Sequence, residues 1–274
     1  MLNANGVSGY TFEARWEDYR LYFLLSAYIS MNCQKKTKKI AEYTETVCWG
    51  YETENGPDVW GQLSPEYGLC SAGIHQSPID IVNPTPAKLP SLTFHYQPTS
   101  LNIRNTGNTI EVVYPEGSWI EVDETKYHLL QFHFHAPSEH RVAGNQYDME
   151  MHLVHTSEDG TLAVIGVLIE VGNTNTAFVP FWDYLPSASG ESKQIKGVIL
   201  NAYDLLPSIK HTYRYMGSLT TPPCSEGVKW FVLTTPVEMS QLQIAAFKSI
   251  LFGNNRPVQP LNDRELLMDA IKDG

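Results

Sequence analysis

Two short segments of this 274-residue chain alternate polar and apolar side chains, and this alternation restricts the fold more than any other feature. The first, residues 131–135, reads Gln-Phe-His-Phe-His, and the second, residues 150–155, reads Glu-Met-His-Leu-Val-His. Successive side chains on a β-strand point to opposite faces. Gln131, His133 and His135 would therefore share one face of a strand and leave the two phenylalanines on the other. The pattern predicts a β-sheet fold with polar chemistry on one face.

The second segment can bring a third histidine to the same place. Residues 136–146 contain proline and glycine, which allow the chain to turn back, so His152 can meet His133 and His135 across an antiparallel pair. Three neutral histidines are a known ligand set for catalytic zinc, and they leave the fourth tetrahedral position for water. We therefore predict that these three histidines bind Zn²⁺.

Two further side chains are placed by the same periodicity to support the ligands. Gln131 lies two residues before His133, and Glu150 lies two residues before His152. Each shares a face with its histidine and can accept the imidazole N–H that does not face the metal, which fixes the tautomer. Three histidines with two such partners indicate a metal site more strongly than histidines alone.

Residues 133–139 taken by themselves allow a different interpretation. His133, His135 and Glu139 have the spacing of the metal-binding core of cupins, in which the glutamate is a ligand. That family usually has glycine six residues before the first histidine and seven after the glutamate, where this chain has Tyr127 and Gln146. A cupin-type metal enzyme stays open as an alternative at this point.

The composition favours a single, strand-rich domain. The chain has 19 Gly, 17 Pro and 15 Tyr, a combination typical of many turns and strands. No repeat or linker divides residues 41–274, so we expect one domain there. The net charge of −11 argues against nucleic acid as a partner. Apolar spacing predicts a helix at residues 240–251. Strands are expected at residues 110–114, 119–122, 127–135, 147–155, 163–171, 213–216 and 229–234.

Residues 1–40 differ from the rest of the chain. The apolar run from Leu21 to Met31 is too short to span a bilayer as a helix, but it has the length of a signal-peptide core. We interpret this segment as an export signal or, alternatively, as an N-terminal extension. Cys33 follows the run and is a candidate for lipid attachment. The expected location is therefore periplasmic or secreted, without an integral membrane span.

Short sequence strings along most of the chain share the order and spacing of one family. These strings are Trp49-Gly50-Tyr51, Asn55-Gly56-Pro57, Gln76-Ser77-Pro78-Ile79-Asp80, Gln131 to His135, Ser138-Glu139-His140, Ser218 to Pro223 and Asn254 to Leu261. Together they resemble the alpha-class carbonic anhydrases, a family of zinc lyases, over about residues 47–265.

The resemblance implies both a fold and a reaction. The fold is mainly β (α+β), with a large, mostly antiparallel twisted central sheet and short peripheral helices in a single domain. The reaction is the reversible hydration of carbon dioxide to bicarbonate and a proton, by attack of zinc-bound hydroxide. A carbonic anhydrase-like binding module with weak catalysis is the alternative that this family allows.

The resemblance also assigns roles to individual residues. Thr220 matches the residue that accepts the hydrogen bond of the hydroxide and donates its own to a buried carboxylate, here Glu139. Other residues match those that form the carbon dioxide pocket or hold ordered water in it, namely Tyr51, Val154, Val164, Leu219, Thr221, Val228 and Trp230. Primary sulfonamides and small anions are the inhibitors that such a site implies.

Three further positions bear on rate and location. Asn108 stands where fast members of the family carry a proton-shuttling histidine. Asparagine cannot accept and release a proton near neutral pH, so we expect slower proton transfer. Secreted members join two cysteines placed like Cys70 and Cys224. The resemblance therefore implies a disulfide between these two residues and an oxidising compartment.

Overall fold

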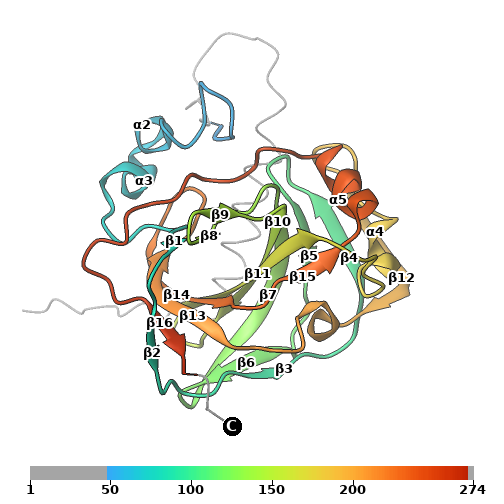
Figure 1. Cartoon of the computed structure of the whole chain (residues 1–274). Coiled ribbons are helices and arrows are strands. Elements are labelled where there is room, and N and C mark those ends of the chain that lie inside the picture. The colour runs from blue at the N-terminus through green and yellow to red at the C-terminus, as the bar shows by residue number, and fades with distance from the viewer. Residues whose placement is uncertain (1–47, 271–274) are drawn as a thin grey trace, which may run out of the picture.

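Strands dominate residues 48–270, which are the residues described by the computed structural model (Figure 1). Thirteen of these strands form one sheet, with mostly antiparallel pairing. Along the sheet the order is β12 (Ser192–Leu200), β4 (Thr99–Asn105), β5 (Ile110–Val113), β7 (Thr125–His135), β10 (Met149–Thr156), β11 (Leu162–Val171), β14 (Glu226–Leu233), β13 (Thr212–Ser218), β16 (Leu267–Asp269) and β2 (Thr85–Ala87).

The remaining strands are short. Two of them, β6 (Trp119–Val122) and β3 (Thr93–His95), continue outward from one end of β7. A third, β15 (Val237–Met239), pairs in parallel with the end of β11. A separate small sheet consists of β1 (Asp80–Ile81), β8 (Arg141–Val142) and β9 (Asn145–Gln146).

The helices are short and lie outside the sheet (Figure 1). They are α2 (Trp60–Leu63), the 3₁₀ helix η1 (Pro65–Tyr67), α3 (Leu69–Ala72), α4 (Val179–Trp182), the 3₁₀ helix η2 (Ala202–Leu205) and α5 (Gln241–Lys248). In Figure 1, α2 and α3 lie together on one side of the molecule, and α4 and α5 lie on another. This architecture confirms the predicted fold class of a mostly antiparallel sheet with short peripheral helices.

The strands predicted from alternation are all present, with ends that differ by a few residues. The predicted helix at 240–251 is also present, but it is shorter. Ser240 is its N-cap and forms a capping box with Gln243, and the helix ends at Lys248. The prediction missed the long strands β4 and β12 and the short strands β1, β2, β3, β8, β9, β15 and β16. Strand β12 is an edge strand whose side chains are largely exposed, so its sequence lacks the apolar alternation of a half-buried strand.

The two faces of the central strands pack into different cores. Phe132 and Phe134 belong to the large core, which also contains Phe181 and Phe247. Val154 belongs to a second cluster on the opposite face. The strand periodicity thus leaves Phe132 and Phe134 in the dry core and directs the alternate histidines of β7 to the other face.

We expect Phe134→Ala to lower the free energy of unfolding by about 3–5 kcal/mol, because it opens a cavity in the large core. Phe134 is fully buried, and its ring packs on those of Phe132, Phe178, Trp182 and Phe247. Chemical denaturation measures the change. Phe252→Ala is the matched control. Since the Phe252 side chain is 68% exposed, this variant should stay within about 0.5 kcal/mol of the wild type. Equal losses in both variants would contradict this packing.

Candidate metal centre

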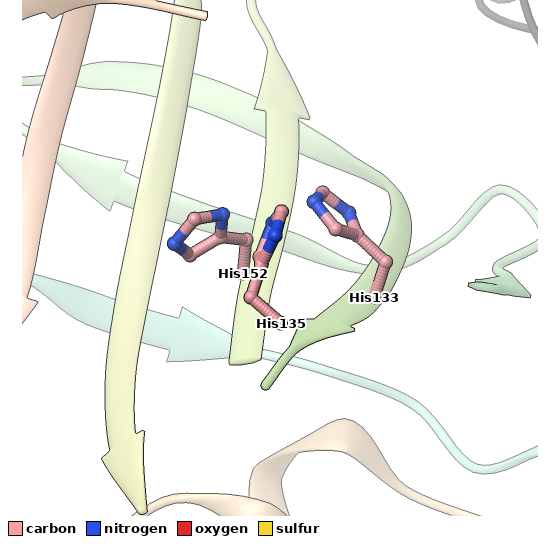
Figure 2. Close-up of side chains that lie close together, drawn as sticks. All are labelled: His133, His135 and His152. Carbon is pink, nitrogen blue, oxygen red and sulfur yellow. The ribbon is translucent and has the colours of Figure 1, made fainter. Parts of the chain in front are cut away.

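Three histidines from β7 and β10 lie on one side of the sheet with their rings side by side (Figure 2). His152 lies opposite His133 in the antiparallel register of these strands, as alternation predicted. The ring centroids are 5.0 Å apart for His133 and His135, and 4.6 Å apart for His135 and His152. One nitrogen of each ring lies within 4.8 Å of a nitrogen of the other two. This arrangement can hold one metal ion.

Two of the three rings have the outer partners that the strand periodicity placed beside them. Nδ1 of His133 lies 2.9 Å from Oε1 of Gln131, and Nε2 of His152 lies 2.9 Å from Oε1 of Glu150. Amide and carboxylate oxygens accept hydrogen bonds, so each ring must place its proton on the nitrogen facing that oxygen. The other nitrogen keeps its lone pair for a metal.

The partner of His135 was missed by the sequence analysis. Its Nδ1 donates to the backbone carbonyl of Asn254, at 2.7 Å and 119 residues away in the chain. The Asn254 side chain also accepts from the backbone N–H of Ala136 and donates to the carbonyl of Phe134. Asn254 therefore fixes the end of the ligand strand as well as the tautomer of the ring. No local spacing pattern pointed to this contact.

The remaining nitrogen of His135 supplies a test of whether a metal fits. His135 is 1% exposed, and within residues 48–270 its Nε2 is buried without a hydrogen-bond partner. A buried polar atom without a partner costs free energy, and natural proteins rarely leave one. A metal ion at the centre of the three rings would satisfy this atom. The residues present therefore fit a zinc site.

Burial keeps these histidines in the form that binds metal. It lowers the pKa of His135 to about 4 and that of His133 well below the ordinary value of histidine, with the neighbouring rings adding to the shift. Burial also lowers the pKa of His152, although Glu150 opposes the shift. All three are therefore neutral near neutral pH, which metal ligation requires.

Glu150 has a full set of hydrogen bonds beneath the rings. Its Oε1 lies 2.9 Å from His152 Nε2 and 2.8 Å from His140 Nδ1. Its Oε2 accepts the backbone N–H groups of Glu139 and His140. Burial alone would raise the pKa of Glu150, but the two histidines outweigh it and hold that pKa well below the usual range. His140, Glu150 and His152 thus form a hydrogen-bonded network in which both oxygens of Glu150 are already engaged.

Glu139 and Thr220 lie together behind the rings. Glu139 is 1% exposed, and its Oε1 accepts the backbone N–H of Arg256 at 2.8 Å. Burial raises the pKa of Glu139 to about 7, while His152 and the Thr220 hydroxyl oppose the rise. Within the described residues, Glu139 Oε2 makes no ordinary hydrogen bond.

A cavity of about 110 Å³ opens above the three histidines. The predicted pocket residues that line it are Tyr51, Val154, Val164, Leu219, Thr221 and Trp230, and Thr220 lines it as well. Asn108 and Gln131 line it as well. Val228 does not line it, although it belongs to the same buried cluster as Val154 and Trp230. The lining therefore combines polar side chains with the apolar side chains of Val154, Val164 and Trp230, which lie opposite one another across β10, β11 and β14.

Glu111 is a cavity residue that the sequence analysis did not identify. It lies on β5, is 7% exposed and lines the cavity. Arg104 on β4 donates from Nε to Glu111 Oε1 at 3.0 Å. Burial raises the pKa of Glu111, and the charge and hydrogen bonds of Arg104 oppose this rise. The signal that could have identified Glu111 is its strand, which pairs with the ligand strand β7.

A disulfide joins Cys70 and Cys224, as the resemblance implied. Arg256 reinforces the same region, because it is 1% exposed and donates to the carbonyl of Cys70 at 2.8 Å. The N–H of Cys224 donates to the carbonyl of Thr221 at 2.9 Å. The segment that carries Thr220 is therefore tied covalently to α3.

Within residues 48–270 no helix is long and apolar enough to cross a membrane. The expected export signal and Cys33 lie outside the described residues.

Comparison with known proteins identifies relatives over most of this chain. The sequence model of the family described as eukaryotic-type carbonic anhydrase matches residues 55–270. A carbonic anhydrase from a Nostoc species is 46% identical over 234 residues, which is 83% of this chain and 88% of that protein. A carbonic anhydrase from Neisseria gonorrhoeae is 42% identical over 221 residues, 80% of this chain and 87% of that protein.

A solved structure agrees with these relatives. It is the alpha-carbonic anhydrase from Thermovibrio ammonificans in complex with the inhibitor sulfanilamide. It is 43% identical to this chain, with a TM-score of 0.78, and the match covers 81% of this chain and 99% of the other.

We expect the Cys70→Ala/Cys224→Ala double variant to lose about 2–5 kcal/mol of unfolding free energy, because the bond closes a long loop in the unfolded chain. The two residues are 154 positions apart. Denaturant titration with and without a thiol reductant measures the loss. The reductant should lower the unfolding free energy of the wild type by breaking this bond. The double variant lacks the bond, so the reductant should cause no loss of stability through it. A wild type of equal stability in both conditions would argue against a stabilising bond.

Proposed function

Since this chain belongs to the alpha class of carbonic anhydrases, enzymes that hydrate carbon dioxide, we propose that it does so at a zinc ion held by His133, His135 and His152. The observation that carries the proposal is Nε2 of His135, which is buried, has no hydrogen-bond partner among residues 48–270 and lies next to two further imidazole nitrogens. Bound zinc would supply a nucleophile near neutral pH by lowering the pKa of a water molecule. The products are bicarbonate and a proton.

The residues around the rings hold the ligands in one geometry. Gln131 and Glu150 accept the outer N–H groups of His133 and His152. The Asn254 carbonyl accepts that of His135. Each ring is thereby kept in one tautomer and orientation, so little rearrangement is needed when zinc binds.

Thr220 and Glu139 are proposed to orient the attacking oxygen. The Thr220 hydroxyl has one proton to donate and lone pairs to accept with. If Glu139 accepts the hydrogen bond from the Thr220 hydroxyl, the hydroxyl oxygen can act only as an acceptor. A ligand of the metal that contacts Thr220 must then donate a hydrogen bond of its own. Carbon dioxide has no hydrogen-bond donor, so it lies against the apolar lining residues Val154, Val164 and Trp230 in this proposal.

The same geometry supports inhibition by primary sulfonamides and small anions. An ionised sulfonamide nitrogen keeps one N–H, which the Thr220 hydroxyl can accept. The related enzyme from Thermovibrio ammonificans binds the inhibitor sulfanilamide in its solved structure, and this supports the proposal.

We also propose a periplasmic or secreted location. The disulfide between Cys70 and Cys224 supports an oxidising compartment. The other two interpretations of the sequence are not favoured. The family match is to carbonic anhydrases rather than cupins, and all three histidines are present.

We expect purified protein to contain about one zinc ion per chain, and His135→Ala to lose most of it. Hydration activity should fall by at least about a hundredfold, since removing a ligand should cost no less than removing an outer partner. Elemental analysis and a carbon dioxide hydration assay measure the two effects. His95→Ala is the control, because His95 is exposed on β3, and it should keep both zinc and activity. Full activity without zinc would refute the site.

Proton release is the step in which Asn108 matters. Each hydration produces a proton that must leave the cavity, and Asn108 cannot relay it. We expect kcat to rise steeply with the concentration of an imidazole-type buffer, while kcat/KM hardly changes, because carbon dioxide capture precedes proton release. Asn108→His should raise kcat in dilute buffer and flatten this dependence. Steady-state kinetics across a buffer series provides the test.

The opposite outcome would be equally clear. A wild type that turns over rapidly in dilute buffer, with no gain from Asn108→His, would mean that another route carries the proton.

A further inference from the structure

Cys48 is the first residue that the structure describes, and its sulfur is not a free thiol. It is disulfide-bonded, and none of the cysteines among residues 48–270 is free. The hydration chemistry proposed above makes no use of Cys48. Its partner is therefore another cysteine of this chain or a cysteine of a second copy.

The sequence narrows the choice of partner within the chain. The three other cysteines are Cys33, Cys70 and Cys224. Cys70 and Cys224 are joined to each other, so neither can also bond to Cys48. Both are buried, and burial protects their bond from attack by another thiol. Elimination leaves Cys33, which lies outside the described residues.

The short separation in sequence favours Cys33 over a cysteine of a second chain. Residues 34–47 are all that separates it from Cys48. In the unfolded chain, a linker of this length holds two thiols at an effective concentration on the order of millimolar. A thiol on a second chain is far more dilute in any ordinary preparation. Bonding within the chain therefore competes better than bonding between chains.

We propose that Cys33 and Cys48 form a second disulfide of this chain. The two thiols give up two protons and two electrons, and one S–S bond forms. A disulfide of the oxidising compartment, on an oxidoreductase or on glutathione, accepts them by thiol–disulfide exchange and is reduced to two thiols. A sulfur atom in a disulfide cannot also carry a lipid thioether. The pairing thus excludes lipid attachment at Cys33.

The proposed bond adjoins one wall of the catalytic cavity. Cys48 directly precedes Trp49, which lines that cavity. The Trp49 ring contacts those of Tyr51 and Trp60 edge-on, with centroids 6.0 and 5.5 Å apart. Trp60 belongs to the same buried cluster as the disulfide described above. Two disulfides would thus flank one aromatic cluster beside the cavity.

Peptide mapping of the full chain tests the pairing directly. The reduced protein is refolded in a glutathione redox buffer, alkylated to block remaining thiols and digested without reductant. Trypsin cuts at the lysines of residues 35–39, between Cys33 and Cys48, and a glutamate-specific protease cuts at Glu52, between Cys48 and Cys70. We expect one linked pair of peptides that carries Cys33 and Cys48. An alkylated Cys48, or Cys48 bonded to glutathione or to a second copy, would overturn the proposal.

Two reciprocal variants serve as matched controls. In Cys33→Ser, Cys48 should become a thiol or a mixed disulfide with glutathione, and in Cys48→Ser the same should hold for Cys33. The bond between Cys70 and Cys224 should be present in both variants. If Cys48 had the same chemical state in the wild type and in Cys33→Ser, the proposed pairing would be wrong.

Protein from the native host decides whether the bond forms in the cell. Thiols are alkylated before the cells are opened, and the purified protein should give the same linked pair of peptides. A lipid on Cys33 would contradict the proposal, and so would a mature N-terminus beyond Cys33, because Cys48 would then have no partner in the chain. Hydration activity does not enter this test, so the disulfide and the proposed function can fail separately.

Discussion

The register between β7 and β10 is the constraint on which the rest of the site depends. His152 lies opposite His133, so the third ring reaches the two that β7 already supplies. A slip of one residue would turn every side chain of β10 to the other face and replace this histidine with an apolar neighbour. The fold holds the register because Phe132 and Leu153, which are paired across the same strands, must lie in the large core. Core packing and site geometry are therefore two results of one pairing.

The fold tolerates the buried polar side chains of this site only because nearly every one of them has a hydrogen-bond partner. Glu150 carries a charge in the interior, and four hydrogen bonds from histidine and backbone N–H groups compensate it. The network continues from His140 to the Tyr215 hydroxyl, and from there to the Ser77 hydroxyl. Ser77 in turn accepts the backbone N–H of Ser218, two residues before Thr220. The ligand strand and the Thr220 loop are thus linked through the interior.

The cavity above this network combines apolar and polar lining. Val154, Val164 and Trp230 lie opposite one another across β10, β11 and β14, and they suit an uncharged gas molecule. Asn108, Glu111 and Gln131 supply polar groups to the same lining. In the proposed reaction, Asn108 provides no internal relay for the released proton.

The sequence by itself determined which side chains share a face. Alternation on two short segments predicted the three histidines, and it placed Gln131 and Glu150 beside their rings, because strand periodicity acts over two residues. The family resemblance added the pairing of Cys70 with Cys224, which the structure contains. Each of these is either a local pattern or a set of strings whose order along the chain can be compared directly.

Only the tertiary structure decided which distant segments meet. Asn254 is 119 residues from His135, and no spacing rule links a carbonyl at that distance to an imidazole. Glu111 faces the cavity because β5 pairs with β7 in one register, and Arg104 reaches it from the next strand. Val228 belongs to the second core cluster and does not line the cavity. Register and packing are collective properties of the whole sheet, so local sequence cannot fix them.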